Sequence, residues 1–131
     1  MDVRYFSPEE AAAALPQVRP LLAALRDAFH AYRFAREQHE ELVAFGEAQT
    51  DEAAKWRREA EAQAERVQAL VDEIGALGAD VKDPLLGLID FYHKRADGTI
   101  VLLCYRDDED ALRFWHPLDT GFAGRRPLDE L

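Results

Sequence analysis

The chain has 131 residues, the length of one domain, and 48% of them are hydrophobic, so it can bury a core without disulfides or a structural metal. Its 26 acidic and 16 basic residues give a formal net charge of −10. Such a negative field opposes binding to nucleic acids and to anionic membranes. The single cysteine, Cys104, excludes an intrachain disulfide framework.

The start of the chain bears on its location. The segment MDVRYFSPEE lacks the basic region and the following apolar run of a secretory signal peptide. No stretch of the sequence approaches the ~18 uninterrupted apolar residues that a membrane-spanning helix needs. We therefore expect a soluble cytoplasmic protein with no membrane partner.

The residues before about position 79 have a helical composition. Residues 7–10, SPEE, contain a capping box and a proline in the first turn, which predict the start of a short capped helix. Pro16 is expected to end or kink this helix, because proline lacks an N–H and clashes with the preceding turn. A long helix is predicted from residue 16 or 17 to residue 45, with Gly46 as its stop.

A second long helix is predicted from Thr50, its N-cap, to Leu77. In both long helices apolar residues recur at alternating spacings of three and four, which is typical of lengthwise, coiled-coil-like packing. The short connection between the helices predicts an antiparallel hairpin of roughly 40 Å. Its distal half, residues 34–60, extends beyond what a small β region can cover, so we expect that half to have a partner, most simply a second copy of the chain.

Arg36 and His39 occupy positions of the first long helix where apolar residues are expected. A histidine in such a seam suggests a carboxylate-bridged metal site, but the required Glu-x-x-His motif is missing and the second helix has no histidine. The favoured interpretation is that Arg36 and His39 pair with carboxylates of the second helix, such as Glu59, or fix the register of a dimer.

The residues after position 80 predict an antiparallel β meander of three strands. Asp97-Gly98 is a strong hairpin signal between two apolar runs. The strands are expected at residues 86–94, 99–106 and 111–116. The expected fold is therefore α+β, a single domain over residues 1–131 with the helical hairpin region at 7–79 and the β meander and C-terminal loop at 80–131.

Asp90 lies inside the otherwise apolar strand segment GLIDFYH. If its side of the strand is buried, the ionised carboxylate needs a partner, and the adjacent Arg125 and Arg126 are the densest local supply of positive charge. The favoured interpretation is a structural ion pair between Asp90 and Arg125. In the other orientation of the strand, Asp90 is half exposed.

His116 ends the third predicted strand, and Asp119 follows three residues later. This spacing lets a carboxylate orient an imidazole, as happens around metals and catalytic bases. A structural histidine beside an Asx-type turn explains the same two residues. The pair is the place where we would look first for a site.

The segment GFAGRRP at residues 121–127 predicts a loop that doubles back. Gly121 and Gly124 permit positive φ on either side of Phe122, whose ring can act as a plug. Adjacent arginines on such a segment point in opposite directions, so only one of them faces any pocket.

Cys104 lies in the apolar run IVLLCYR, which is typical of a buried and unreactive thiol. The sequence contains no Gly-x-Ser-x-Gly, Walker or HExxH motif. The known catalytic motifs therefore do not favour an enzyme.

The segment YFSPEEAAAALPQVRPLL and the residues from 87 to 128 resemble a bacterial family known as domain of unknown function 2203, and the resemblance spans essentially the whole chain. Tyr92 and Tyr105 depart from the family pattern, which tends to have proline and tryptophan there. The resemblance implies no activity, only that four polar residues belong to the pattern: Asp90, Cys104, His116 and Arg125. The matching blocks are Gly87, Leu88, Asp90 and Phe91; Leu103 and Cys104; Trp115 and His116; and Gly121, Phe122, Gly124 and Arg125.

Three hypotheses of function follow from these patterns. The first is an interaction or structural module that forms a homodimer, or binds a protein partner, through the helical hairpin. The second is a small-molecule, anion or metal site, with or without catalysis. Its candidate residues are Asp90, His116, Asp119, Arg125 and Arg126, of which the first three are the candidate ligands of a divalent metal; no other cofactor is predicted. The third and weakest is nucleic-acid binding through local basic patches, which acidic residues flank closely.

Overall fold

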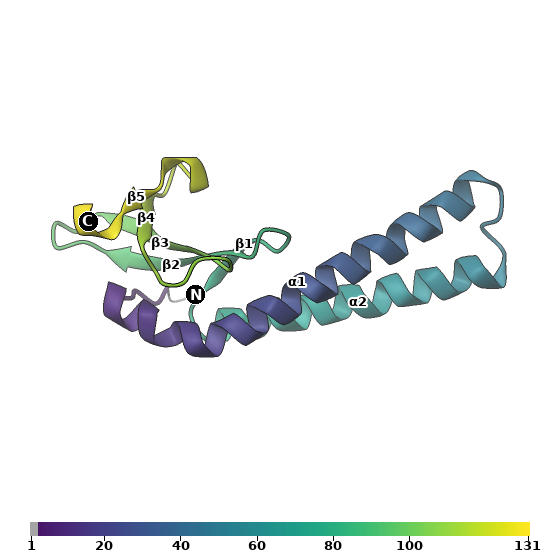
Figure 1. The fold of residues 1–131 in the computed structure, drawn as a ribbon, viewed down its shortest axis with the longest axis horizontal. Coiled ribbons are helices and arrows are strands. Elements are labelled where there is room, and N and C mark those ends of the chain that lie inside the picture. The colour runs from purple at the N-terminus through teal and green to yellow at the C-terminus, as the bar shows by residue number, and fades with distance from the viewer. Residues whose placement is uncertain (1–2) are drawn as a thin grey trace.

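Two helices precede one five-stranded antiparallel sheet (Figure 1), so the predicted α+β class is confirmed. The computed structural model describes residues 3–131; Met1 and Asp2, the first residues of the predicted domain, lie outside this part. The helices are α1 (Pro8–Ala44) and α2 (Asp51–Ala76), and the strands are β1 (Asp80–Asp83), β2 (Leu88–Lys94), β3 (Ile100–Arg106), β4 (Phe114–Pro117) and β5 (Arg126–Pro127).

Helix α1 begins at the predicted capping box. The Glu10 N–H donates to Ser7 Oγ at 3.0 Å, and the Ser7 N–H donates to Glu10 Oε1 at 2.9 Å. Of the two outcomes expected at Pro16, an end of the helix is wrong, because α1 continues through Pro16 and Pro20 as one bent helix (Figure 1). Leu15, Val18 and Leu22 flank the prolines and are buried in the core, and their burial outweighs the two backbone hydrogen bonds that the prolines remove.

Helix α2 runs back alongside α1 after a short connection (Figure 1). Gly46, with φ of +78°, follows the end of α1, and Thr50 Oγ1 caps α2 by accepting from the Ala53 N–H at 3.1 Å. The core includes residues of α1 up to Ala28 and of α2 from Val67 onward. We call residues 29–66 between them the arm, which extends beyond the sheet (Figure 1).

The predicted contact of Arg36 with a carboxylate of the second helix is wrong. Arg36 Nε donates to Glu40 Oε1 on its own helix at 3.0 Å, and Glu59 accepts from Gln63 of its own helix at 3.0 Å. Partners four residues apart lie one turn away on the same helix, so they meet without reaching across to the other helix. Within residues 3–131, neither helix has the length and apolar character needed to cross a membrane.

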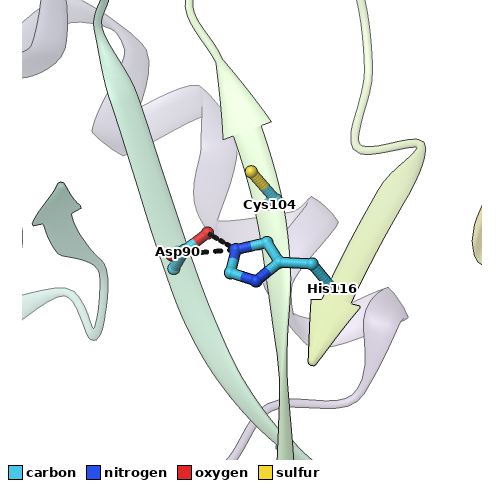
Figure 2. Close-up of side chains that lie close together, drawn as sticks. All are labelled: Asp90, Cys104 and His116. Atoms are coloured by element: carbon cyan, nitrogen blue, oxygen red, sulfur yellow. Dashed lines mark hydrogen bonds and ion pairs between the residues drawn. The ribbon is translucent and has the colours of Figure 1, made fainter. Parts of the chain in front are cut away.

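The helices cover one face of the sheet. Alternate residues of β2 and β3, among them Phe91 and Leu103, join Trp115 of β4 and the buried side of the helices in one hydrophobic core. The opposite, outer face of the sheet carries the remaining alternate positions, which include Asp90, Cys104 and His116 (Figure 2).

The sheet has five strands, so the prediction of three was wrong. β1 and β5 add one strand at each edge. β1 has the sequence DVKD, whose three charged residues hide it from a search for apolar runs, and β5 contains only two residues. The third predicted strand begins at Phe114 rather than at residue 111. The predicted Asp97-Gly98 turn is confirmed: Gly98 has φ of +91°, and the Arg95 N–H donates to the Thr99 carbonyl at 2.8 Å.

Candidate functional site

Three polar side chains from three neighbouring strands meet on the outer face of the sheet (Figure 2). Asp90 of β2 lies directly opposite Cys104 of β3, and His116 of β4 lies opposite Leu102 of β3, so alternation puts all three side chains on one face. Asp90 is 1% exposed, Cys104 0% and His116 3%. We call these three residues the buried cluster.

Both ring nitrogens of His116 have oxygen partners. Nδ1 lies 2.8 Å from the Pro117 carbonyl oxygen, and Nε2 lies 3.2 Å from Asp90 Oδ1 and 3.3 Å from Oδ2. A carbonyl oxygen can only accept, so Nδ1 carries a hydrogen. The contact between Nε2 and Asp90 therefore holds a single proton, on either the imidazole or the carboxyl group. In both cases the net charge of the Asp90–His116 pair is zero.

Burial raises the pKa of both acidic groups of the cluster, the Asp90 carboxyl group and the Cys104 thiol. Burial raises the pKa of Asp90, while the charge of His116 and hydrogen bonds from Cys104 and His116 oppose that rise. Burial, followed by the charge of Asp90, raises the pKa of the Cys104 thiol from 9.0 to about 12. The thiol is therefore protonated at neutral pH, and without a change in its surroundings it is not a nucleophile.

The predicted ion pair between Asp90 and Arg125 is wrong. Arg125 Nη2 donates instead to Glu109 Oε1 at 2.6 Å and to the Cys104 carbonyl oxygen at 3.2 Å. Its guanidinium carbon lies 4.1 Å from the centre of the Phe114 ring. Glu109 belongs to the acidic turn after β3, and this turn supplies a carboxylate closer to Arg125 than the one inside β2.

The other predicted site residues lie outside the buried cluster. Asp119 is exposed and makes no hydrogen bond with His116, whose imidazole is oriented by Asp90 and Pro117 instead. Arg126 stacks on Trp115, with its guanidinium carbon 5.5 Å from the ring centre. Because Trp115 belongs to the core side of the sheet, the two adjacent arginines do point to different sides, as predicted.

Of the two glycines expected to allow positive φ in the return loop after β4, only Gly121 adopts it, and Gly124 does not. Gly121 has φ of +63° and precedes the short 3₁₀ helix η1 (Phe122–Gly124). The Phe122 ring is 37% exposed and lies under the guanidinium groups of Arg106 and Arg125. Phe122 is thus a platform for cations at the edge of the sheet rather than a buried plug.

The strands and the return loop around the buried cluster lie within the match to one sequence family. The pattern of DUF2203, described as an uncharacterised conserved protein, matches residues 4–128. The chain belongs to the DUF2203 family. No curated protein and no solved structure matches the chain. The DUF2203 match includes all three residues of the buried cluster, so the cluster is part of the family domain.

The apolar run around Cys104 predicts only an unreactive core residue, and the sequence pattern does not predict Glu109 as the partner of Arg125. The signal for Cys104 was its position relative to the Asp97-Gly98 turn, which brings β3 back along β2. The signal for Glu109 is the acidic run at residues 107–110, which predicts a turn and also supplies carboxylates beside the end of β3. Which residue lies opposite which depends on the length of the turn before β3 for Cys104 and of the turn after β3 for Glu109. Composition does not reveal the length of either turn.

Proposed function

We propose that this protein is an interaction module that forms a homodimer through its arm. The observation that carries the proposal is how little the arm buries: of residues 29–66, only Ala35 and Ala53 are buried. Two alanines provide little of the apolar burial that normally holds packed helices together. A second arm packed against the first would bury the faces that α1 and α2 leave open.

The surface proposed to receive the second copy is a groove of about 300 Å³ between the two helices of the arm. Tyr32 and His39 of α1 line one side of it, and Ala60 and Ala64 of α2 line the other. Small alanine side chains let another helix approach closely, so this groove suits helix packing better than it suits a compact ligand. In the proposed dimer, α1 and α2 act as an antiparallel hairpin and pair with their counterparts in a coiled-coil-like, four-helix arrangement.

The charges around the groove favour a second copy of the chain over a partner whose surface is strongly positive or strongly negative. Arg36, Arg57 and Glu61 line it as well, so both signs are present. Arg57 and Glu61 are 4.0 Å apart with side chains 62% and 68% exposed, so this contact within one chain is weak and its members are free to pair elsewhere. In a two-fold interface, a contact between a basic residue of one copy and an acidic residue of the other occurs twice, once from each copy. A face that carries both charges is therefore complementary to itself.

Large exposed apolar side chains also gather towards the far end of the arm. Phe34 is 54% exposed, Val43 46% and Phe45 74%. Phe34 lies against Trp56 of α2, with ring centres 5.5 Å apart, and this contact covers only part of its ring. Three large apolar side chains exposed on one helix end favour a surface that becomes buried in an assembly.

Sedimentation velocity over a concentration series tests the proposal. Ala64→Glu places a charge in the groove at an exposed position where glutamate is a good helix former, so the variant should fold and dissociate. Ala62→Glu makes the same change two residues away on the same helix, outside the groove, and should sediment as the wild type does. A wild-type protein that stays monomeric throughout, or two variants that behave alike, would refute dimerisation through this groove.

A further inference from the structure

The buried cluster has no role in the proposed dimer, although it combines three of the strongest metal-ligating groups in proteins. The candidate ligand atoms of Asp90, Cys104 and His116 all lie within 4.8 Å of one another (Figure 2). We propose that these residues bind one divalent transition metal ion of the zinc type. The site is separate from the arm and does not depend on dimerisation.

The donor set indicates the class of metal. A thiolate and an imidazole are ligands of zinc and its neighbours, and Mg²⁺ and Ca²⁺ prefer sites made of oxygen alone. Nε2 of His116 and Oδ1 of Asp90 are 3.2 Å apart. Two ligands of a tetrahedral zinc ion with bonds of ~2.0 Å are roughly 3.3 Å apart, so this pair already has the right spacing. The Cys104 sulfur, directly opposite Asp90 on β3, lies within 4.8 Å of the other two ligand atoms and would complete one triangular face of the tetrahedron when it closes on the ion.

The surroundings hold the histidine as a metal ligand. Metal-binding imidazoles commonly donate their second N–H to a backbone carbonyl, which fixes the tautomer and the ring orientation. His116 Nδ1 is 2.8 Å from the Pro117 carbonyl oxygen, so Nε2 is the nitrogen that points at the other two ligands. Pro117 is the last residue of β4, so the end of the strand positions the Pro117 carbonyl oxygen beside the His116 ring.

The charges of the cluster also fit a divalent ion. A bound divalent ion would have its two positive charges balanced by one thiolate and one carboxylate, beside a neutral imidazole. The protons that the free ligands hold would pass to solvent on binding. The occupied site would therefore leave no unbalanced charge inside the protein.

Three protein ligands leave one position of a tetrahedral ion for water or for another small ligand. The cluster lies on three adjacent, hydrogen-bonded strands, and its residues are 0 to 3% exposed. An ion in this place would therefore exchange slowly with solvent and would tie β2, β3 and β4 together. Metal is best supplied while the chain refolds, before the cluster closes.

Cobalt(II) is the probe for the test, because its thiolate complexes absorb in the near ultraviolet and its tetrahedral complexes absorb in the visible. The full chain is refolded with Co²⁺ after removal of metal by a chelator. We expect one Co²⁺ per chain with thiolate charge-transfer absorption, and loss of that absorption when excess Zn²⁺ competes with Co²⁺ during refolding. A wild-type protein that refolds normally without this absorption would overturn the proposal.

Variants separate the cluster from its surroundings. Cys104→Ser, a close match in size, should abolish the charge-transfer band, and His116→Ala should weaken binding by more than tenfold. Asp119→Asn is the matched control, because it changes an exposed aspartate near His116 and should bind as the wild type does. A band that persists in Cys104→Ser would exclude this site. Ala64→Glu, which is designed to separate the dimer, should keep full cobalt binding, so each proposal can fail without the other.

Discussion

Asp90 and His116 bridge two strands that are not neighbours: the carboxylate of β2 lies 3.2 Å from the imidazole of β4, and β3 runs between the two strands. Both side chains are at most 4% exposed, so water cannot replace the polar contact that each makes with the other. Breaking such a pair from one side leaves a buried group without its partner, and the cost depends on what replaces the lost group.

Two substitutions of Asp90 should therefore differ in metal-free protein. In Asp90→Asn the amide N–H can donate to Nε2 while Nδ1 keeps its hydrogen on the Pro117 carbonyl, so His116 remains satisfied. Asp90→Leu removes the partner altogether. We expect the leucine variant to lose about 1–3 kcal/mol more free energy of unfolding than the asparagine variant, measured by urea denaturation. Equal losses would show that the Asp90–His116 contact contributes little.

Cys104 should make the protein less stable at high pH. The pKa of its thiol is raised from 9.0 to about 12 in the folded chain, so above pH 9 the unfolded chain gives up a proton that the folded chain retains. The stability that this thiol contributes below pH 9 is then lost at about 1.4 kcal/mol per pH unit until the pH reaches the folded value. Comparing the unfolding of wild type and Cys104→Ala at several values above pH 9 isolates this slope, because the other titrating groups are common to both proteins. Parallel curves would contradict the raised pKa.

The helices and the β2–β3 hairpin could be predicted because their signals are local. Ser7 and Thr50 mark helix starts, and Asp97-Gly98 marks the turn. The register across that turn was not predictable. A two-residue loop of Asp97 and Gly98 would place Asp90 opposite Tyr105, whereas the observed loop of three residues places it opposite Cys104. One residue of loop length thus decides whether the buried cluster exists.

Long-range partners were harder to predict than elements. The favourable pairing of Asp90 with an arginine was chosen on charge alone, and the structure pairs Asp90 with His116 and Arg125 with Glu109. Likewise Pro16 carries a local signal to end a helix, and core packing against the sheet overrides it. Local chemistry indicated that a polar residue buried in an apolar strand needs a partner, but only the three-dimensional arrangement of the strands decides which residues pair.

The Arg125–Glu109 pair should couple strongly. Their side chains are only 11% and 13% exposed, and Nη2 lies 2.6 Å from Oε1. A double-mutant cycle with Arg125→Ala and Glu109→Gln should give a coupling of about 1–3 kcal/mol in urea unfolding. Arg113 and Asp110 provide a control pair in the same part of the chain, with side chains 59% and 79% exposed, and their coupling should be clearly smaller. Couplings of similar size would mean that burial does not strengthen the Arg125 contact.

Gly78 should be the glycine least able to accept a side chain. It follows α2 with φ of +99°, and a β-carbon there would overlap the ring of Phe6. Phe6 cannot easily move away, because it is 2% exposed and its N–H donates to the Tyr92 carbonyl at 2.7 Å. Gly46 follows α1 with φ of +78° and has open space around it, so Gly46→Ala should lose only the ~1–2 kcal/mol that a left-handed backbone costs an alanine.

Gly78→Ala should lose that backbone cost and a further ~1–3 kcal/mol from overpacking the core, measured by urea unfolding of both variants. The difference between the two variants reports the packing of Phe6 alone, because the backbone cost is common to both. If Gly78→Ala were no less stable than Gly46→Ala, Phe6 would have to yield its place at little cost. The residues before α1 would then not hold the end of α2 against the sheet, and the contact of Phe6 with Phe91, whose ring centres are 5.0 Å apart, would not be a fixed part of the core.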